Sequence, residues 1–161
     1  MAERQIAEVV ERMKLSDSRR AEVKMYPRQL LKLAGSLVEE EQRHWYNLAI
    51  IVANMACELA VEQVFNNLLD QKNISNLQRF IIPRDTSYNI CAPKIKDIYN
   101  ELANDRIQRD ENAFWKPLTD SVKHRNDIVH RGIMFERGDA EKSLRAVSDL
   151  ISYLDQKFGT S

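Results

Sequence analysis

One long segment of the chain is apolar on almost every side of a helix. The 14 residues from Leu48 to Val61 read LAIIVANMACELAV, and Glu58 is the only charged side chain among them. A helix that is apolar all round has to be buried, so this segment predicts the central helix of a bundle. The segment is shorter than the roughly 20 apolar residues that a membrane-spanning helix needs. We therefore expect a soluble, cytoplasmic protein with no membrane contact.

Helical spacing of apolar residues extends over most of the chain. Four glycines and four prolines are also few for a turn-rich β-sandwich or barrel of 161 residues. The sequence therefore predicts an all-α, compact up-and-down helical bundle. Helices are expected at 2–14, at 28–34 with Gly35 near the end, at 38–71 as one helix or two nearly collinear ones, at 94–109, at 113–131, and at 139–158 with Asp139 as a cap.

The N-terminal part of the chain is expected to be an addition to this bundle. A polar break at 16–18 and Pro27 interrupt it, so we divide the chain into a helical extension, 1–35, and a bundle domain, 36–161. Residues 1–34 hold eight Lys and Arg against five acids, whereas residues 36–70 hold one arginine against six acids. This distribution fits either two solvated faces of opposite sign or a basic surface for a polyanion.

Arg125 lies within an apolar helical stripe. Leu118, Val122 and Val129 fall within about 40° of one another on a helical wheel, and Arg125 falls inside the same stripe. An arginine on the core side of a helix costs several kcal/mol if it is unpaired, so an acid should meet it. Glu58, the one charge in the central segment, is the best candidate. The alternative is that Glu58 belongs to a narrow solvent strip, with Asn47, Asn54 and Glu62.

Asn126 and His130 are four residues apart, so they share a helical face and can hydrogen-bond. Gly132 is expected to end the helix and to leave His130 in its last turn. An arginine offers a planar fork of donors to an anion, and a histidine can move a proton near neutral pH. A patch of arginine, amide and histidine therefore suits a phosphate better than a metal ion.

The segment Arg125-Asn126-Asp127-Ile128-Val129-His130 resembles the R-x4–6-H motif of the HEPN superfamily, in which a polar residue usually follows the arginine. The surroundings are also similar: a long preceding helix with an internal Glu58, the sequence R-N-x-x-x-H-R-G, and a closing amphipathic helix. The likeness covers residues 40 to 158 and leaves the N-terminal 35 residues unexplained.

The resemblance implies an all-α bundle that forms a homodimer with the two motifs near the two-fold axis. Many members of the superfamily are metal-independent ribonucleases, among them toxins of toxin–antitoxin pairs and phage-defence effectors. Others are interaction modules without activity. A cognate antitoxin or a nucleotidyltransferase is the partner that the toxin interpretation implies.

Our leading hypothesis is therefore an endoribonuclease that cleaves RNA through the ribose 2′-hydroxyl. His130 would act as base or acid, Arg125 would stabilise charge on the phosphorane oxygens, and Asn126 would orient His130 or the phosphate. Glu58 would support Arg125 as an ion pair. The alternatives are a non-catalytic HEPN-like module that binds a partner protein or a nucleotide, and an architectural helical subunit.

Other groups carry weaker signals. The three histidines and the cysteines Cys57 and Cys91 have no zinc-type spacing and no disulfide framework, and no phosphate loop occurs, so we expect neither a metal nor a cofactor. The region 73–93 breaks the helical pattern and interleaves Arg and aromatic residues, which fits either RNA contacts or ordinary loop packing. The basic residues proposed to contact RNA are Lys123, Arg131, Arg79 and Arg84.

Overall fold

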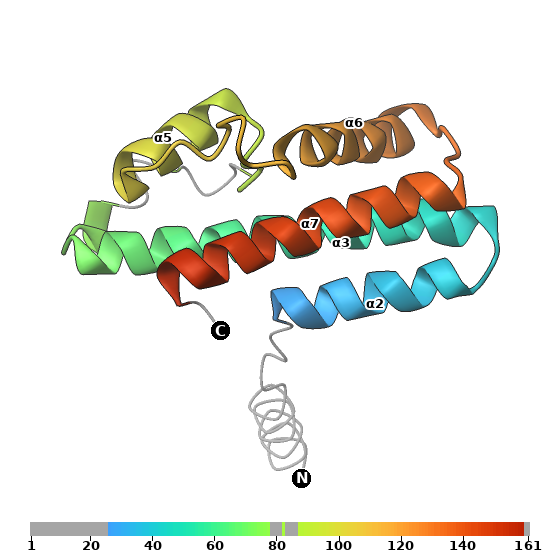
Figure 1. Cartoon of the computed structure of the whole chain (residues 1–161), viewed down its shortest axis with the longest axis horizontal. Helices are drawn as coiled ribbons and strands as arrows, with labels where there is room; N and C mark the ends of the chain where they lie inside the picture. The colour runs from blue at the N-terminus through green and yellow to red at the C-terminus, as the bar shows by residue number, and fades with distance from the viewer. Residues whose placement is uncertain (1–25, 78–81, 83–86, 160–161) are drawn as a thin grey trace, which may run out of the picture.

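The structure is a computed structural model that describes residues 26–77, 82 and 87–159 (Figure 1). This part of the chain contains helices and no strand, which confirms the predicted all-α fold for the described residues. The elements are α2 (Pro27–Glu39), α3 (Arg43–Gln71), the short 3-10 helix η1 (Ser75–Leu77), α5 (Pro93–Ala103), α6 (Trp115–Arg131) and α7 (Arg137–Phe158). The helix predicted over 2–14 and the break at 16–18 lie outside the described residues.

The central helix of the bundle is α3. Its 29 residues extend over about 43 Å at 1.5 Å per residue. The apolar side chains that it buries cover most of its circumference, as predicted for a central helix: Tyr46, Ala49, Ile50, Val52, Ala53, Ala56, Cys57, Ala60, Val61, Val64, Phe65, Leu68 and Leu69. Leu48 and Met55 are exceptions on one face, with 38% and 52% of their surface exposed.

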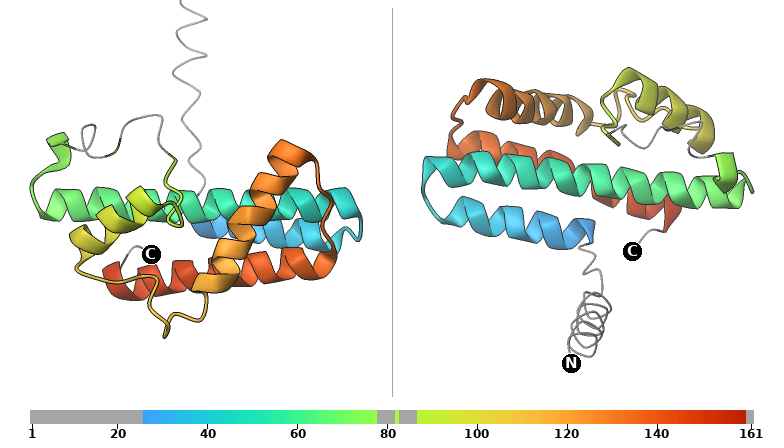
Figure 2. Two further views of the ribbon diagram at one scale, coloured as in Figure 1. Left: turned by 90° about the horizontal axis from the view of Figure 1, so that it is seen from above. Right: turned by 180° about the vertical axis from the view of Figure 1, so that it is seen from behind.

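The helices form two layers. Helices α2, α3 and α7 all pack against one another, and α6 packs across α3 and α7. Figure 1 shows α5 and α6 above this three-helix layer. Figure 2, from above, shows that α6 crosses α7 and α3 obliquely and that its C-terminal end extends beyond α3. The last turns of α6 are therefore packed on fewer sides than its first turns.

α2 is longer than the sequence predicts. It continues through Gly35 to Glu39, because Leu30, Ala34 and Val38 form one buried row at four-residue spacing. This row packs against the neighbouring helices. The packing stabilises α2 by more than the roughly 1 kcal/mol by which an interior glycine disfavours a helix.

The boundary that we expect at residues 35 and 36 falls inside α2. The helix packs against both α3 and α7 along its length, so the residues from Pro27 onward contribute to the bundle core. Residues 1–25 lie outside the described part of the chain.

The helix predicted over 38–71 is wrong at its start. Residues 38 and 39 end α2, residues 40–42 form a turn, and Glu41 has a left-handed φ of 51°. The apolar pattern does not indicate this turn, because Val38 is buried in α2 just as the following apolar residues are buried in α3. As a result α2 and α3 form an antiparallel hairpin (Figure 1), and the rest of the predicted segment is the single helix α3.

α5 ends six residues before its predicted end at 109. Asn104 takes the left-handed conformation, with φ of 47° and ψ of 51°, and the chain turns away from the helix axis. The following loop is closed by side chains: Asn100 accepts a hydrogen bond from the Ile107 amide at 3.2 Å, and Ile107 is fully buried. These contacts come from tertiary structure, which the local spacing does not contain.

The ends of α6 and α7 agree closely with the sequence. Gly132 ends α6 with φ of 65°, as predicted. Asp139 caps α7 from its third position, since its carboxylate accepts a hydrogen bond of 3.3 Å from the backbone amide of Glu136, which is the N-cap residue. The predicted apolar stripe of α7 is buried at Val147, Leu150, Ile151 and Leu154.

By length and composition alone, α3 could cross a membrane. In its most apolar stretch 61% of the residues are buried inside the bundle, as in the core helix of a soluble protein.

Candidate functional site

A line of polar side chains on α3 supports α6. Asn54 is 4% exposed and donates a hydrogen bond of 2.9 Å to the hydroxyl of Ser121, which is itself 1% exposed. Asn47 is 8% exposed and contacts the chain that follows α6. The alternative of a solvent strip is therefore wrong for Asn47 and Asn54, because α6 covers Asn54 and the segment after α6 covers Asn47.

Arg125 and Glu58 approach each other across these two helices, as the sequence predicts. Arg125 Nη2 lies 3.9 Å from Glu58 Oε1, and the side chains are 35% and 30% exposed. Arg125 Nη1 also donates a hydrogen bond of 3.0 Å to Asn126 Oδ1. The guanidinium is thus held between an acid on α3 and an amide on α6.

Arg125 is more exposed than its place in an apolar stripe suggests. Leu118 is fully buried, but Val129, three turns later on the same stripe, is 54% exposed. The difference follows from the oblique crossing of α6, whose C-terminal end extends past α3 (Figure 2). The stripe therefore faces the core at one end and leaves it at the other.

His130 is exposed in the last turn of α6, and Asn126 is exposed one turn earlier. The two lie about 40° apart around the helix and share a flank. The Oδ1 of Asn126 accepts its hydrogen bond from Arg125, and the hydrogen bond that Asn126 and His130 could form is not made in the described structure. We call Arg125, Asn126 and His130 the Arg–His face.

The basic residues proposed to contact RNA divide into two groups. Lys123 and Arg131 are on α6, with side chains 69% and 67% exposed, and each pairs with an acid on the preceding turn, Asp120 at 3.6 Å and Asp127 at 3.1 Å. Surface pairs of this kind are weak, so both cations are available to a polyanion. Arg79 and Arg84 lie outside the described residues.

No group of three or more histidine, cysteine or acidic side chains is placed to hold a metal ion in the described part of the chain. Both cysteines are free. Burial raises the pKa of the Cys57 thiol, and the nearby Cys91 and Glu58 add to the increase. Burial also raises the pKa of Cys91 to about 11, against a lowering effect of its contact with Thr119. Neither cysteine is a thiolate at neutral pH.

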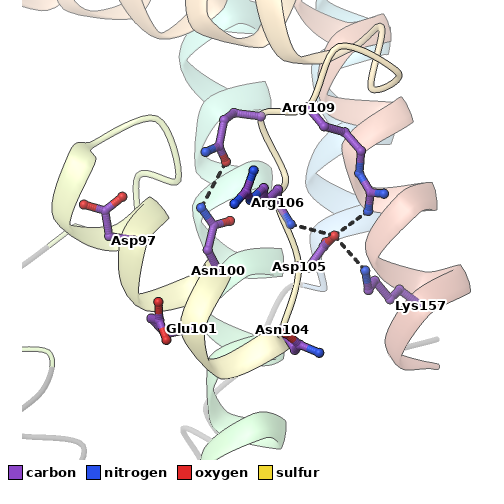
Figure 3. Close-up of a pocket in the computed structure, with 9 residues that line it drawn as sticks. Asp97, Asn100, Glu101, Asn104, Asp105, Arg106, Arg109 and Lys157 are labelled. Carbon is purple, nitrogen blue, oxygen red and sulfur yellow. Dashed lines mark hydrogen bonds and ion pairs between the residues drawn. The ribbon is translucent and has the colours of Figure 1, made fainter.

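A second polar group, which the sequence analysis missed, surrounds Asp105. Its side chain is 1% exposed and accepts hydrogen bonds from Tyr99 at 3.0 Å, Tyr153 at 2.5 Å and Arg109 at 2.5 Å. Lys157 Nζ lies 2.9 Å from the same carboxylate. Figure 3 shows Arg109 and Lys157 converging on Asp105. We call these five residues the Asp105 cluster.

The Asp105 cluster lies at an open cleft of about 650 Å³ between α5 and the end of α7. Burial alone would raise the pKa of Asp105, but hydrogen bonds from Lys157, Tyr153 and Tyr99 outweigh it and lower the pKa to about 2. Burial and the adjacent carboxylate raise the pKa of Tyr99. The carboxylate is thus charged and its acceptor positions are occupied, which leaves nothing free for a ligand.

A third polar feature is a cavity of about 600 Å³ between α6 and α7, lined in part by His124, Lys142 and Arg145. His124 stacks on Phe135 with ring centroids 4.2 Å apart. Its Nδ1 is buried without a hydrogen-bond partner among the described residues. Because this nitrogen is closed to solvent, it does not present itself to a ligand in the cavity.

Comparisons of the chain with protein-family models, with curated proteins and with solved structures give no match.

Proposed function

We propose that the chain is a metal-independent endoribonuclease of the HEPN type, with the Arg–His face as its site. The observation that carries the proposal is the hydrogen bond of 3.0 Å from Arg125 to Asn126. Asn126, which accepts this bond, shares a flank of α6 with His130, so the bond connects the guanidinium to that flank. A guanidinium and an imidazole linked in this way suit a phosphodiester, and the resemblance of the R-N-x-x-x-H segment supports the same conclusion.

In the proposed reaction the ribose 2′-hydroxyl loses its proton and attacks the adjacent phosphorus. The bond from phosphorus to the 5′-oxygen breaks, and that oxygen takes up a proton. His130 serves as the base or as the acid, and Arg125 stabilises the charge that grows on the phosphorane oxygens. Asn126 keeps the guanidinium in place. The products are a 2′,3′-cyclic phosphate and a 5′-hydroxyl, and DNA, which has no 2′-hydroxyl, is not cut.

The reaction uses a base and an acid, and one chain supplies one His130, so we propose a homodimer that brings two copies of the face together. Four exposed apolar side chains on α3, α6 and the segment after α6 are candidate contacts for the second copy. Leu48 and Met55 share one face of α3, and Val129 and Met134, 54% and 49% exposed, belong to α6 and the segment after it.

Lys123, Arg131, Arg79 and Arg84 are the proposed contacts to the RNA backbone. A cytoplasmic enzyme of this kind needs restraint, and a cognate antitoxin, or a nucleotidyltransferase that serves as one, is the partner that we propose.

The test is RNA cleavage in excess chelator by the wild type, Arg125→Ala and His130→Ala. Arg145→Ala, which removes an exposed cation on α7, is the control. The wild type and the control should cleave equally, and the two site variants should each lose about 100-fold or more in rate. Equal cleavage by all four proteins would remove the proposed site.

The second candidate is a non-catalytic helical module in which Arg125 and Glu58 form a structural pair. Their approach at 3.9 Å across α3 and α6 is the observation that favours it. In that case Arg125→Ala would lower the melting temperature, His130→Ala would not, and no protein in the series would cleave RNA.

A further inference from the structure

The side chain of Asn47, near the start of α3, clamps the chain that follows α6. Its Nδ2 donates a hydrogen bond of 2.8 Å to the carbonyl oxygen of Ile133, and its Oδ1 accepts one of 2.9 Å from the amide of Phe135. The sulfur of Met134 lies 3.3 Å from the same Nδ2. One amide group therefore holds both sides of a three-residue segment.

This clamp sets one position of the segment. A primary amide can donate and accept at once, so a shift of the 133–135 backbone by one residue would break both bonds. Asn47 is 8% exposed, and water cannot easily replace the lost partners. The clamp is therefore costly to open.

The clamped segment also closes the last turn of α6. The amide of Ile133 donates a hydrogen bond of 3.3 Å to the carbonyl of Asp127, and the amide of Gly132 donates one of 3.1 Å to the carbonyl of Ile128. In the sequence, His130 lies between the two acceptors and the two donors. The position of its backbone thus depends on Ile133, which Asn47 holds.

We propose that Asn47 is a positioning residue, which acts through Ile133 and the last turn of α6 to orient His130. The consequence for cleavage rests on the proposed function, whereas the orientation itself does not. The hydrogen bonds of Asn47 go to the segment 133–135, and Asn47 has no place in the proton transfers. Its effect is to keep the imidazole on the flank of α6 that His130 shares with Asn126.

Asn54 offers a matched control on the same helix. It is also a buried asparagine of α3, but it bonds to Ser121 in the middle of α6, more than two turns before His130. Loss of Asn54 should weaken the contact between α3 and α6 and leave the segment 133–135 in place.

The experiment compares Asn47→Ala, Asn47→Asp and Asn54→Ala in the full chain. The imidazole signals of His130, identified with His130→Gln, are followed by NMR together with RNA cleavage and melting temperature. Asn47→Asp keeps the acceptor for the Phe135 amide and replaces the donor to Ile133 with a carboxylate oxygen that repels the Ile133 carbonyl. It therefore targets the Ile133 contact, and it serves as the second variant if Asn47→Ala does not fold.

We expect both Asn47 variants to shift the His130 signals, and Asn47→Ala to lower kcat about 10-fold or more with KM within about 3-fold. Asn54→Ala should lose comparable thermal stability and keep the wild-type His130 signals and kcat. Unshifted His130 signals in the Asn47 variants, or equal shifts and losses in Asn54→Ala, would overturn the proposal. If the wild type does not cleave RNA, the NMR comparison still decides the orientation, and only the proposed function fails.

Discussion

The Asp105 cluster and the Arg–His face differ in what their polar groups are left to do. The Asp105 cluster borders the cleft of about 650 Å³ between α5 and the end of α7. It holds a carboxylate that is 1% exposed and has a pKa lowered to about 2. Every one of these features is typical of an active site, yet they are equally typical of structural ion pairs. All acceptor positions of Asp105 are occupied by groups of the protein.

The Arg–His face has the opposite character. Arg125 is oriented by Glu58 and Asn126 but keeps 35% of its side chain exposed, and His130 is open to solvent. The difference lies in whether the polar groups are used up within the fold or remain open to solvent. The Asp105 cluster joins α5 to α7, and the Arg–His face stays open to solvent.

The largest effect should separate the two regions by activity. His130→Gln should slow RNA cleavage by about 100-fold to 10,000-fold, because it removes a proton-transfer group. The same change should alter the free energy of unfolding by less than about 0.5 kcal/mol, since the side chain is exposed. Single-turnover cleavage and urea unfolding measure the two quantities, and a loss of stability that matches the loss of activity would contradict the comparison.

Asp105→Ala should have the opposite effect: the protein should lose stability and keep its activity. Removal of a buried, fully bonded carboxylate should cost about 3–5 kcal/mol of unfolding free energy, because the hydroxyls of Tyr99 and Tyr153 lose their acceptor. Cleavage per folded molecule should stay as in the wild type. Asp97→Ala, an exposed carboxylate that lines the same cleft, is the control and should be close to neutral in urea unfolding. A neutral Asp105→Ala would show that the cluster is not a structural joint.

The pH dependence of stability should come in part from the same carboxylate. Its pKa is lowered from 3.8 to about 2 in the folded protein, so its contribution is present above about pH 4 and is lost as the pH falls toward 2. The shift corresponds to about 2 kcal/mol. The loss of melting temperature between pH 4 and pH 2 should be smaller in Asp105→Asn, and an identical acid profile in both proteins would contradict this assignment.

The smallest effect concerns the end of the helix that carries the Arg–His face. Gly132→Ala should cost about 1 kcal/mol, because φ of 65° strains a residue with a side chain although nothing lies within 4 Å of the added carbon. Gly138→Ala is the matched control, since its surroundings are equally open and its φ is not positive. Thermal melts of the two variants should differ in sign or size, and equal values would show that the turn after α6 tolerates alanine.

The predictable parts of the fold are those with long apolar patterns. The segment Leu48–Val61 predicts the central helix, and the stripe of α7 predicts the face that it buries, because periodicity over many residues reports burial directly. The ends near Gly35 and residue 109 are wrong, since they depend on contacts with other helices. Apolar spacing does not contain that information.

The same reasoning applies to the two polar regions. Arg125 and Glu58 are predictable because each is the single charge in an apolar surface, and a charge there requires a partner. The Asp105 cluster was missed because its residues are spread from Tyr99 to Lys157, and only the packing of α5 against the end of α7 brings them together. The solvent strip remained open as an alternative for Asn47 and Asn54 for a similar reason, since the placement of α6 and of the segment after it decides their burial.

The proposed activity of the Arg–His face is cleavage of RNA through the 2′-hydroxyl without a metal ion. The most direct test is a mass-spectrometric analysis of the RNA ends released in excess chelator by the wild type and by His130→Ala. We predict 2′,3′-cyclic phosphate and 5′-hydroxyl ends from the wild type and none above background from the variant. Ends of another kind, or the same ends in the same amount from His130→Ala, would contradict the claim.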